Sequence, residues 1–222
     1  MEIKQPLIFS VTQKESILDT SIYKSLQDLG ITYYSITADN TKALSTMYNA
    51  GLNFARSYEY DCVIFVHDDV TLLEDPIPRL EKLFDDYDIV GVAGTSKIEL
   101  KPPALWHLMG GGFDGGNLHG QVNHNHNGQI LPTYFGKYPH RVVMIDGVFM
   151  ALNLKAITES SFDEENPSNF HFYDINFSCD SHKKGLKLGV GDIPIVHESQ
   201  GLKSFTDDWL AGEKYFLNKY NK

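Results

Sequence analysis

Short apolar runs alternate with amphipathic segments over roughly residues 1–95, and this alternation limits the fold more than any other feature of the chain. Apolar runs bounded by turn residues predict buried strands, and apolar residues at helical spacing predict helices. The expected strands are 7–11, 31–36, 62–66 and 89–93, and the expected helices are 18–29, 44–55 and a segment after Pro76. Alternation of this kind predicts an α/β fold with a mostly parallel central sheet flanked by helices.

The rest of the chain begins with an irregular region. Residues 97–140 are rich in Gly, His, Asn and Pro and have no clear period, which predicts long loops or short β-ribbons. His124 and His126 fall in this region without cysteine partners, so free imidazoles are expected there rather than a zinc site. Regular structure is expected again as strands within 141–152, 187–190 and 193–197, and as helices over about 170–184 and 204–220.

Composition narrows the class of protein. The formal net charge of -10 argues against a nucleic-acid partner, which would require a basic face. Cys62 and Cys179 are the two cysteines, and we expect both to be reduced and structural. The sequence shows no signal peptide and no apolar run long enough to span a membrane, which predicts a cytoplasmic protein. The last helix carries aromatic and lysine residues; we expect its apolar face to pack on the core, with peripheral membrane contact as the alternative.

His67-Asp68-Asp69 directly follows the apolar run 62–66. A buried strand that ends in this way places two carboxylates at the carboxyl edge of the sheet, where open α/β sheets bind ligands. Adjacent carboxylates repel each other, and a hard divalent cation that also holds phosphates would offset their charge. A solvated turn is the alternative interpretation.

Four segments, in this order along the chain, resemble the glycosyltransferases of family 2 and related families with the GT-A fold. They are Tyr48-Asn49-Ala50-Gly51, Val66-His67-Asp68-Asp69-Val70, Ile145-Asp146-Gly147-Val148-Phe149-Met150, and Phe172-Tyr173-Asp174 followed by Val196-His197-Glu198-Ser199. The resemblance spans most of the chain. This chain departs from the family pattern at His67, where the first Asp of a D-x-D motif is usual, and at Asn176, where many relatives have an acidic residue.

The resemblance implies a nucleotide-sugar donor and a divalent ion, Mn²⁺ or Mg²⁺. Asp69 would ligate the ion between the two phosphates, and His197 would be a further metal or phosphate contact; a core or turn histidine is the alternative for His197. The donor would be contacted by six residues of the first part of the chain: Val11, Asp39, Asn40, Asn49, His67 and Asp68. Asp39 and Asn40 are also ordinary turn formers, and Asn49 is alternatively a residue of the helix surface.

The resemblance also implies a catalytic base, Asp174, which would take the proton of an acceptor hydroxyl. The alternative role for Asp174 is that of a carboxylate that interacts with the dipole at a helix N-terminus. The expected acceptor site comprises Trp106, Asp146, Gly147 and Tyr173. For Trp106 and Tyr173, the alternative to acceptor binding is a packing role.

We therefore expect one GT-A domain over residues 1–222, with a nucleotide-binding half at about 1–95 and an acceptor-binding half at about 96–222. The implied reaction is inverting transfer of a sugar, from UDP as the expected nucleotide, to a glycan, a lipid-linked or another hydroxyl acceptor. Polysaccharide or glycoconjugate synthesis would be the setting. The alternatives are a metal-dependent nucleotidyltransferase or hydrolase, and a non-catalytic module that binds nucleotide-sugars.

Overall fold

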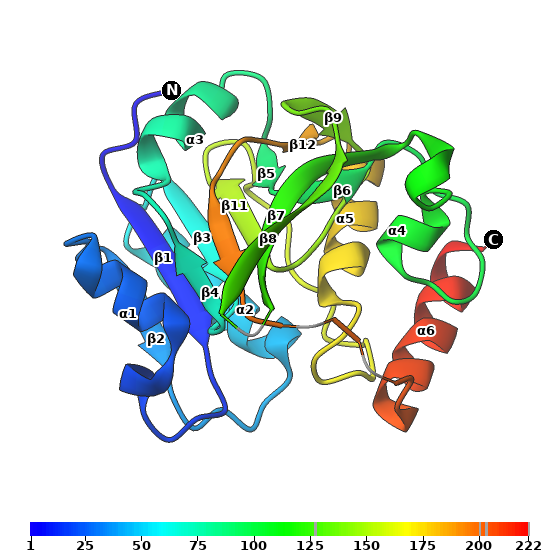
Figure 1. Ribbon diagram of the computed structural model, residues 1–222, viewed down its shortest axis with the longest axis horizontal. Coiled ribbons are helices and arrows are strands. Elements are labelled where there is room, and N and C mark those ends of the chain that lie inside the picture. Colours follow the sequence, from blue (N-terminus) through cyan, green and yellow to red (C-terminus); the bar gives the residue numbers. More distant parts are fainter. Residues whose placement is uncertain (127, 200, 203, 222) are drawn as a thin grey trace.

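A central β-sheet organises the computed structural model, which describes residues 1–126, 128–199, 201–202 and 204–221 (Figure 1). Within these residues its seven strands lie in the order β2-β1-β3-β11-β5-β12-β9. In that order the strands span Tyr34–Thr37, Pro6–Val11, Cys62–Val66, Phe149–Asn153, Ile89–Gly91, Leu188–Val190 and His140–Val142. Strands β2, β1, β3, β5 and β12 run in one direction, whereas β11 and β9 run in the other. The expected α/β fold with a mostly parallel sheet is confirmed.

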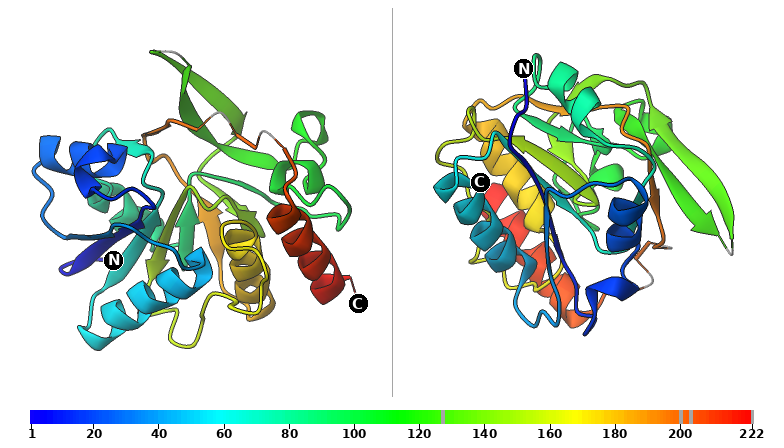
Figure 2. Two further views of the ribbon diagram at one scale, coloured as in Figure 1. Left: turned by 90° about the horizontal axis from the view of Figure 1, so that it is seen from below. Right: turned by 90° about the vertical axis from the view of Figure 1, so that its left-hand side faces the viewer.

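A second, smaller sheet lies against the first, with the path β10-β6-β7-β13-β4 and with β8 paired to β7. These strands span, in the order of that path and then β8, Met144–Ile145, Ala93–Thr95, Leu118–His126, Ile195–His197, Val70–Leu72 and Gln129–Gly136. The β7–β8 hairpin projects from the molecule (Figure 2, left). Of the two expectations for residues 97–140, the β-ribbon is therefore correct for 118–126 and 129–136, and long loops are wrong for these two segments. His124 and His126 lie on β7, not in a loop.

Six helices and two 3-10 turns are present in the described residues. The helices are α1 (Ser21–Asp28), α2 (Leu44–Ser57), α3 (Ile77–Leu83), α4 (Trp106–Met109), α5 (Tyr173–Lys183) and α6 (Asp207–Tyr220), and the turns are η1 (Ile17–Asp19) and η2 (Phe113–Gly115). Threonine caps begin two of the helices, because the hydroxyls of Thr20 and Thr206 accept hydrogen bonds from the first turns of α1 and α6. Gly30, with φ of 67°, follows the end of α1 as expected.

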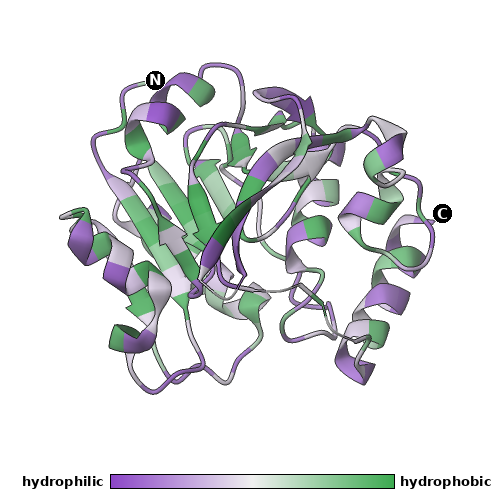
Figure 3. Cartoon of the chain, viewed as in Figure 1, coloured by the Kyte–Doolittle hydropathy of each residue, from purple (hydrophilic) through white to green (hydrophobic). Residues whose placement is uncertain are grey.

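The core has one part on each face of the central sheet, because successive strand residues point to opposite faces. Phe9, Phe65 and Met150 pack toward α2 and the start of α5. Ile8, Ile64 and Ala151 pack toward α1, α3 and the second sheet. The central strands are accordingly the most hydrophobic part of the chain (Figure 3). Both cysteines are free and buried, as expected.

The last helix packs by its apolar face. Trp209, Phe216 and Tyr220 of α6 are buried in the core that also contains Ile175 and Cys179 of α5. Among the described residues, no helix has both the length and the apolar character that a membrane crossing requires. The expected packing of α6 on the core is confirmed.

Candidate active site

The site forms where the two sheets meet. Residues 67–69 make the turn between β3 of the central sheet and β4 of the second sheet. The backbone N–H of His67 donates to the carbonyl of Val148. The carbonyl of Asp68 accepts from the backbone N–H groups of Ser21 and Ile22, at the start of α1. The turn is thereby held from both sides, and its three side chains are fixed in direction.

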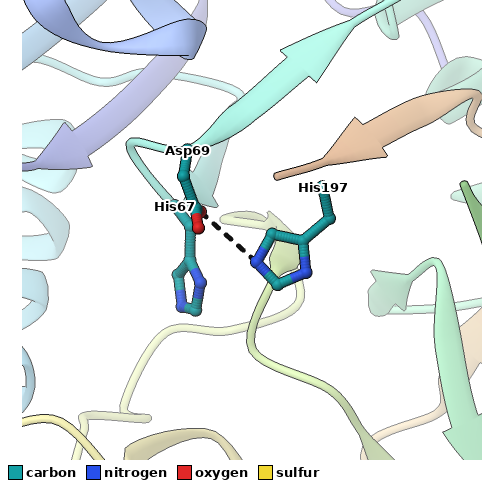
Figure 4. A group of neighbouring side chains, drawn as sticks. All are labelled: His67, Asp69 and His197. Carbon is teal, nitrogen blue, oxygen red and sulfur yellow. Dashed lines mark ion pairs between the residues drawn. The ribbon is translucent and has the colours of Figure 1, made fainter. Parts of the chain in front are cut away.

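His67, Asp69 and His197 form a cluster at this turn (Figure 4). Each offers one ligand atom, and these atoms all lie within 4.8 Å of one another. His197, at the end of β13, places Nε2 3.3 Å from Oδ1 of Asp69. That contact lacks the geometry of a hydrogen bond, so Oδ1 is buried without a hydrogen-bond partner. A buried orphaned carboxylate oxygen between two imidazoles fits a cation site, because such an oxygen is costly unless a donor or cation meets it.

Hydrogen bonds assign the tautomer of His67. Tyr173 Oη lies 3.0 Å from the carbonyl of Gly147, to which it donates, and 2.6 Å from Nε2 of His67. A hydroxyl has only one hydrogen, so Nε2 supplies the hydrogen of the second contact and Nδ1 keeps its lone pair. A metal-ligating histidine is commonly held in this way through its other nitrogen. We expected His67 to contact the donor, whereas the structure places its ring among the potential metal ligands.

The charges of the cluster depend on one another. Burial lowers the pKa of His67, which favours the neutral imidazole. Burial would also lower the pKa of His197, but the neighbouring Asp69 outweighs it and the pKa is raised. Burial would raise the pKa of Asp69, yet its interaction with His197 holds this pKa below the ordinary value. Asp69 is therefore an anion at neutral pH and is available to a cation.

A first cavity, of about 620 Å³, opens beside Asp68 and is called the lysine cavity below. Its walls come from the loops after β1 and β2, the start of α2 and residues 169–171. Lys14 and Lys42 line the cavity from exposed positions, and the ammonium group of Lys14 donates to the carbonyl of Asp19. The side-chain amide of Asn40 donates to the carbonyl of Lys42 and accepts from its backbone N–H. Asp68 is held by a short hydrogen bond from the hydroxyl of Thr12.

Of the expected donor residues, Val11, Asn40 and Asp68 line the lysine cavity. Asp39 is exposed beside it, with φ of 51° and its N–H bonded to the carbonyl of Lys14. Asn49 lies elsewhere. Its amide bonds both the N–H and the carbonyl of Phe162, so it anchors a loop and does not face the cavity.

A second cavity, of about 450 Å³, lies on the other side of the turn and is called the aromatic cavity below. His67 lines this cavity, whereas its neighbour Asp68 lines the lysine cavity. The four expected acceptor residues and Asp174 all line the aromatic cavity: Trp106, Asp146, Gly147, Tyr173 and Asp174. Phe170 and His171 line both cavities and form their shared wall.

Two carboxylates lie close together in the aromatic cavity. Oδ2 of Asp174 accepts the N–H of Gly147 at 2.8 Å. Oδ2 of Asp146 accepts the indole N–H of Trp106 at 2.6 Å, and Oδ1 accepts the N–H of Val148 at 2.9 Å. Burial and the negative charge of Asp146 raise the pKa of Asp174 to about 7. A carboxylate with this pKa is suited to accept a proton near neutral pH.

Gly147 is required by close packing. A Cβ at this position would lie 2.2 Å from Oη of Tyr173 and 2.8 Å from Cβ of Asp174. The groups that approach the backbone here are the side chains of Tyr173 and Asp174. The glycine lets its backbone N–H reach the carboxylate of Asp174, which fixes that group in the cavity.

Several residues of the two cavities were not predicted as site residues: Thr12, Lys14, Lys42, Phe170 and His171. Lys14 and Lys42 follow the ends of two parallel strands, and their positions in those loops are a signal that the sequence does contain. Phe170 and His171 had no comparable signal, because their place between the cavities depends on how the loop before α5 folds back.

A Rossmann-like sheet with an acidic turn after β3, and a cavity lined by each of two neighbouring residues of that turn, are features of a GT-A-like fold. The model of a family described as "Glycosyltransferase like family" matches residues 12–220. This chain belongs to that family.

Comparisons with other proteins bear on the fold. A197 from STIV superposes with a TM-score of 0.51 and 12% identity, over 91% of this chain and 98% of that chain. At this identity the likeness concerns the fold alone. The inositol-1-phosphate CTP transferase from T. maritima gives a TM-score of 0.40 and 13% identity, over 95% of this chain and 77% of that chain, and this weaker likeness supports no conclusion. Comparison of the sequence with curated proteins gives no match.

Proposed function

We propose that this protein is a metal-dependent glycosyltransferase that moves a sugar from a nucleoside diphosphate, UDP in the first instance, to a hydroxyl acceptor with inversion. The observation that carries the proposal is the cluster of His67, Asp69 and His197, in which His67 lines the aromatic cavity and its neighbour Asp68 lines the lysine cavity. A donor in one cavity and an acceptor in the other would bring the reacting atoms together beside this cluster.

The lysine cavity is proposed to hold the donor. Asp68 is available to the ribose hydroxyls, and Asn40 and Val11 lie where the base would be. Lys14 and Lys42 provide positive charge at the mouth of the cavity, which favours an anionic diphosphate. The cavity is built mainly from the half at about 1–95, and the aromatic cavity mainly from the half at about 96–222. This division supports the proposed donor and acceptor halves of a single domain.

The metal ion would be held by Asp69, His197 and His67. Two imidazoles with one carboxylate suit Mn²⁺ better than Mg²⁺, which prefers oxygen ligands. When bound, such an ion supplies positive charge that stabilises a departing diphosphate. Tyr173 orients His67 through the bond to Nε2, which keeps Nδ1 available.

Asp174 is the proposed general base. The acceptor oxygen forms a bond to the anomeric carbon, the bond from that carbon to the diphosphate breaks, and the hydroxyl proton passes to the carboxylate of Asp174. Attack on the side opposite the leaving group inverts the anomeric configuration. The N–H of Gly147 holds Asp174 in place, and Asp146 keeps its pKa high enough to accept the proton near pH 7.

Calorimetry with UDP tests the proposal. We expect wild-type protein to bind UDP in the presence of Mn²⁺ and to bind it at least about 10-fold more weakly with EDTA, since coordination to the ion is lost. Asp69→Ala should remove the dependence on Mn²⁺. Asp28→Ala, which changes an exposed carboxylate of α1, is the control and should behave as wild type. Unchanged UDP affinity in Asp69→Ala with Mn²⁺ would count against the metal site. Cleavage of a nucleotide-sugar panel without transfer to any hydroxyl other than water would favour the hydrolase alternative.

A further inference from the structure

The two cavities differ in charge. The lysine cavity is lined by Lys14, Lys42 and one carboxylate, Asp68, whereas the aromatic cavity has two carboxylates, Asp146 and Asp174, and no lysine or arginine in its described lining. His107 and His171 also line the aromatic cavity, and burial lowers the pKa of each, so both imidazoles are uncharged near neutral pH. A phosphate or carboxylate on a ligand would therefore meet like charge in the aromatic cavity, while hydroxyl groups would find two carboxylates that accept hydrogen bonds.

The walls of the aromatic cavity suit the apolar face of a ring. Trp106 and Trp209 contribute indole surface, and Phe170 stands at the boundary with the lysine cavity. The Phe170 side chain remains 48% exposed, and its ring centroid lies 5.6 Å from that of His67. Because Phe170 lines both cavities, its aromatic ring can contact a ligand that lies in the aromatic cavity beside the cluster.

We propose that the aromatic cavity binds an uncharged sugar ring as the acceptor, with the ring of Phe170 as its platform, and discriminates against sugars that carry a phosphate or a carboxylate. This inference rests on the proposed function, because it assigns the acceptor of the reaction in which Asp174 is the base. It makes Phe170 a specificity-determining residue. The hydroxyls of the sugar are held by Asp146 and Asp174, and the C–H face of the sugar lies on the aromatic ring.

The chain contains a built-in reporter for this test. Its two tryptophans, Trp106 and Trp209, both line the aromatic cavity. Intrinsic tryptophan fluorescence therefore responds to a ligand in this cavity without any added label. We would titrate the full chain, with Mn²⁺ and UDP present, with methyl glycosides of glucose, galactose, mannose and N-acetylglucosamine. Each neutral sugar is paired with its 6-phosphate or, for glucose and galactose, its uronic acid.

We expect at least one neutral glycoside to change the fluorescence saturably and its anionic partner to bind at least about 10-fold more weakly. Phe170→Ala should weaken the binding of the neutral sugar by roughly 2- to 10-fold, the range that an aromatic contact provides. Phe170→Tyr keeps an aromatic ring and should retain most of the wild-type affinity. Phe54→Ala is the matched control, because Phe54 is also an exposed aromatic residue, at 43%, and lies on α2 outside both cavities.

Three results would overturn the proposal. They are equal or tighter binding of the anionic sugar, unchanged binding in Phe170→Ala, and no response to any neutral glycoside. Calorimetry with UDP on the same samples separates this failure from failure of the proposed function. If UDP binding depends on Mn²⁺ while no neutral sugar binds, the proposed donor site is supported and the proposed acceptor is contradicted.

Discussion

Asp174 combines two properties that a structural carboxylate does not need. Its pKa is raised to about 7 by burial and by Asp146, and its carboxylate faces a cavity. A helix N-terminal carboxylate that served only the dipole would be stabilised as an anion, with a lowered pKa. The raised pKa therefore favours the general base over the dipole role that the sequence left open.

We expect Asp174→Asn to lose about 10²–10⁴-fold in kcat, the usual contribution of a general base. Affinity for UDP with Mn²⁺ should change little, because the base acts on the acceptor hydroxyl and mainly in the transition state. Steady-state kinetics with an active donor and acceptor, alongside calorimetry, measure the two effects. Wild-type turnover in this variant would place the base elsewhere, with Asp146 as the next candidate. A product with retained anomeric configuration would contradict both the inversion and the role of Asp174.

Residue identity alone could predict part of this site. The pair Asp68-Asp69 after an apolar run indicated the sheet edge correctly, and the four residues expected to bind the acceptor line one cavity. The metal-ligand geometry of His67 could not be predicted, because it depends on Tyr173 and on the carbonyl of Gly147. Asn49 was assigned to the donor from its motif, and only the fold reveals its bonds to Phe162.

At the scale of elements, α6 holds residues 168–172, which contribute to the walls of both cavities, through hydrogen bonds and packing. Oδ2 of Asp208 accepts the hydroxyl of Ser168 and Oδ1 accepts the N–H of Asn169, next to the shared wall. Phe172, with φ of 67°, packs its ring 5.2 Å from that of Trp209. A non-glycine residue in this conformation is held against strain by its surroundings. The C-terminal helix thus fixes the backbone immediately before Asp174.

Asp208→Ala should therefore weaken the fold and the site together. Loss of two hydrogen bonds to a charged acceptor costs about 1–3 kcal/mol, and each kcal/mol lowers Tm by about 2–4 °C in a domain of this size. We also expect weaker UDP binding, because residue 169 lines the lysine cavity. Asp207→Ala is the matched control, since Asp207 is exposed in the same first turn of α6. Equal effects of the two variants in thermal unfolding would mean that the helix dipole, not the wall, explains the loss.

The elements themselves were largely predictable. β3 was expected at its observed bounds, because five buried apolar residues leave no helical alternative of that length. β4 was missed because Val70–Leu72 is too short to show a period and pairs only with distant β13. The β7–β8 hairpin was expected only as one of two options, since its Asn- and His-rich strands are specified by pairing within the second sheet and not by hydrophobic alternation.

For the whole molecule, the raised pKa of Asp174 predicts how stability depends on pH. The unfolded chain ionises this carboxyl near about 4, whereas the folded protein keeps its proton until about 7. Between these values the folded state binds more protons, so this group makes stability fall as pH rises. The free-energy cost is complete above the folded pKa, and a group that served stability alone would not carry it.

Asp174→Asn removes this cost, and we expect the variant to be more stable than wild type at pH 8 by at least about 1 kcal/mol, or roughly 2–4 °C in Tm. The difference should shrink as pH falls toward 4.5, where wild-type Asp174 is largely protonated. Calorimetric unfolding in EDTA at both pH values measures it, so that the metal ligands do not contribute through a bound ion. A difference in Tm that is the same at both pH values would contradict the raised pKa.

The cluster of His67, Asp69 and His197 joins distant parts of the sequence across the two sheets. His67 and Asp69 lie at the β3–β4 turn, whereas His197 lies at the end of β13. Strand β13 pairs with β4 and β7. Contacts between such distant residues require a long loop to close, which costs conformational entropy. During synthesis, a nascent chain on the ribosome cannot assemble the cluster until residue 197 has emerged. Products that terminate before β13 would therefore lack His197 and could not form the complete cluster.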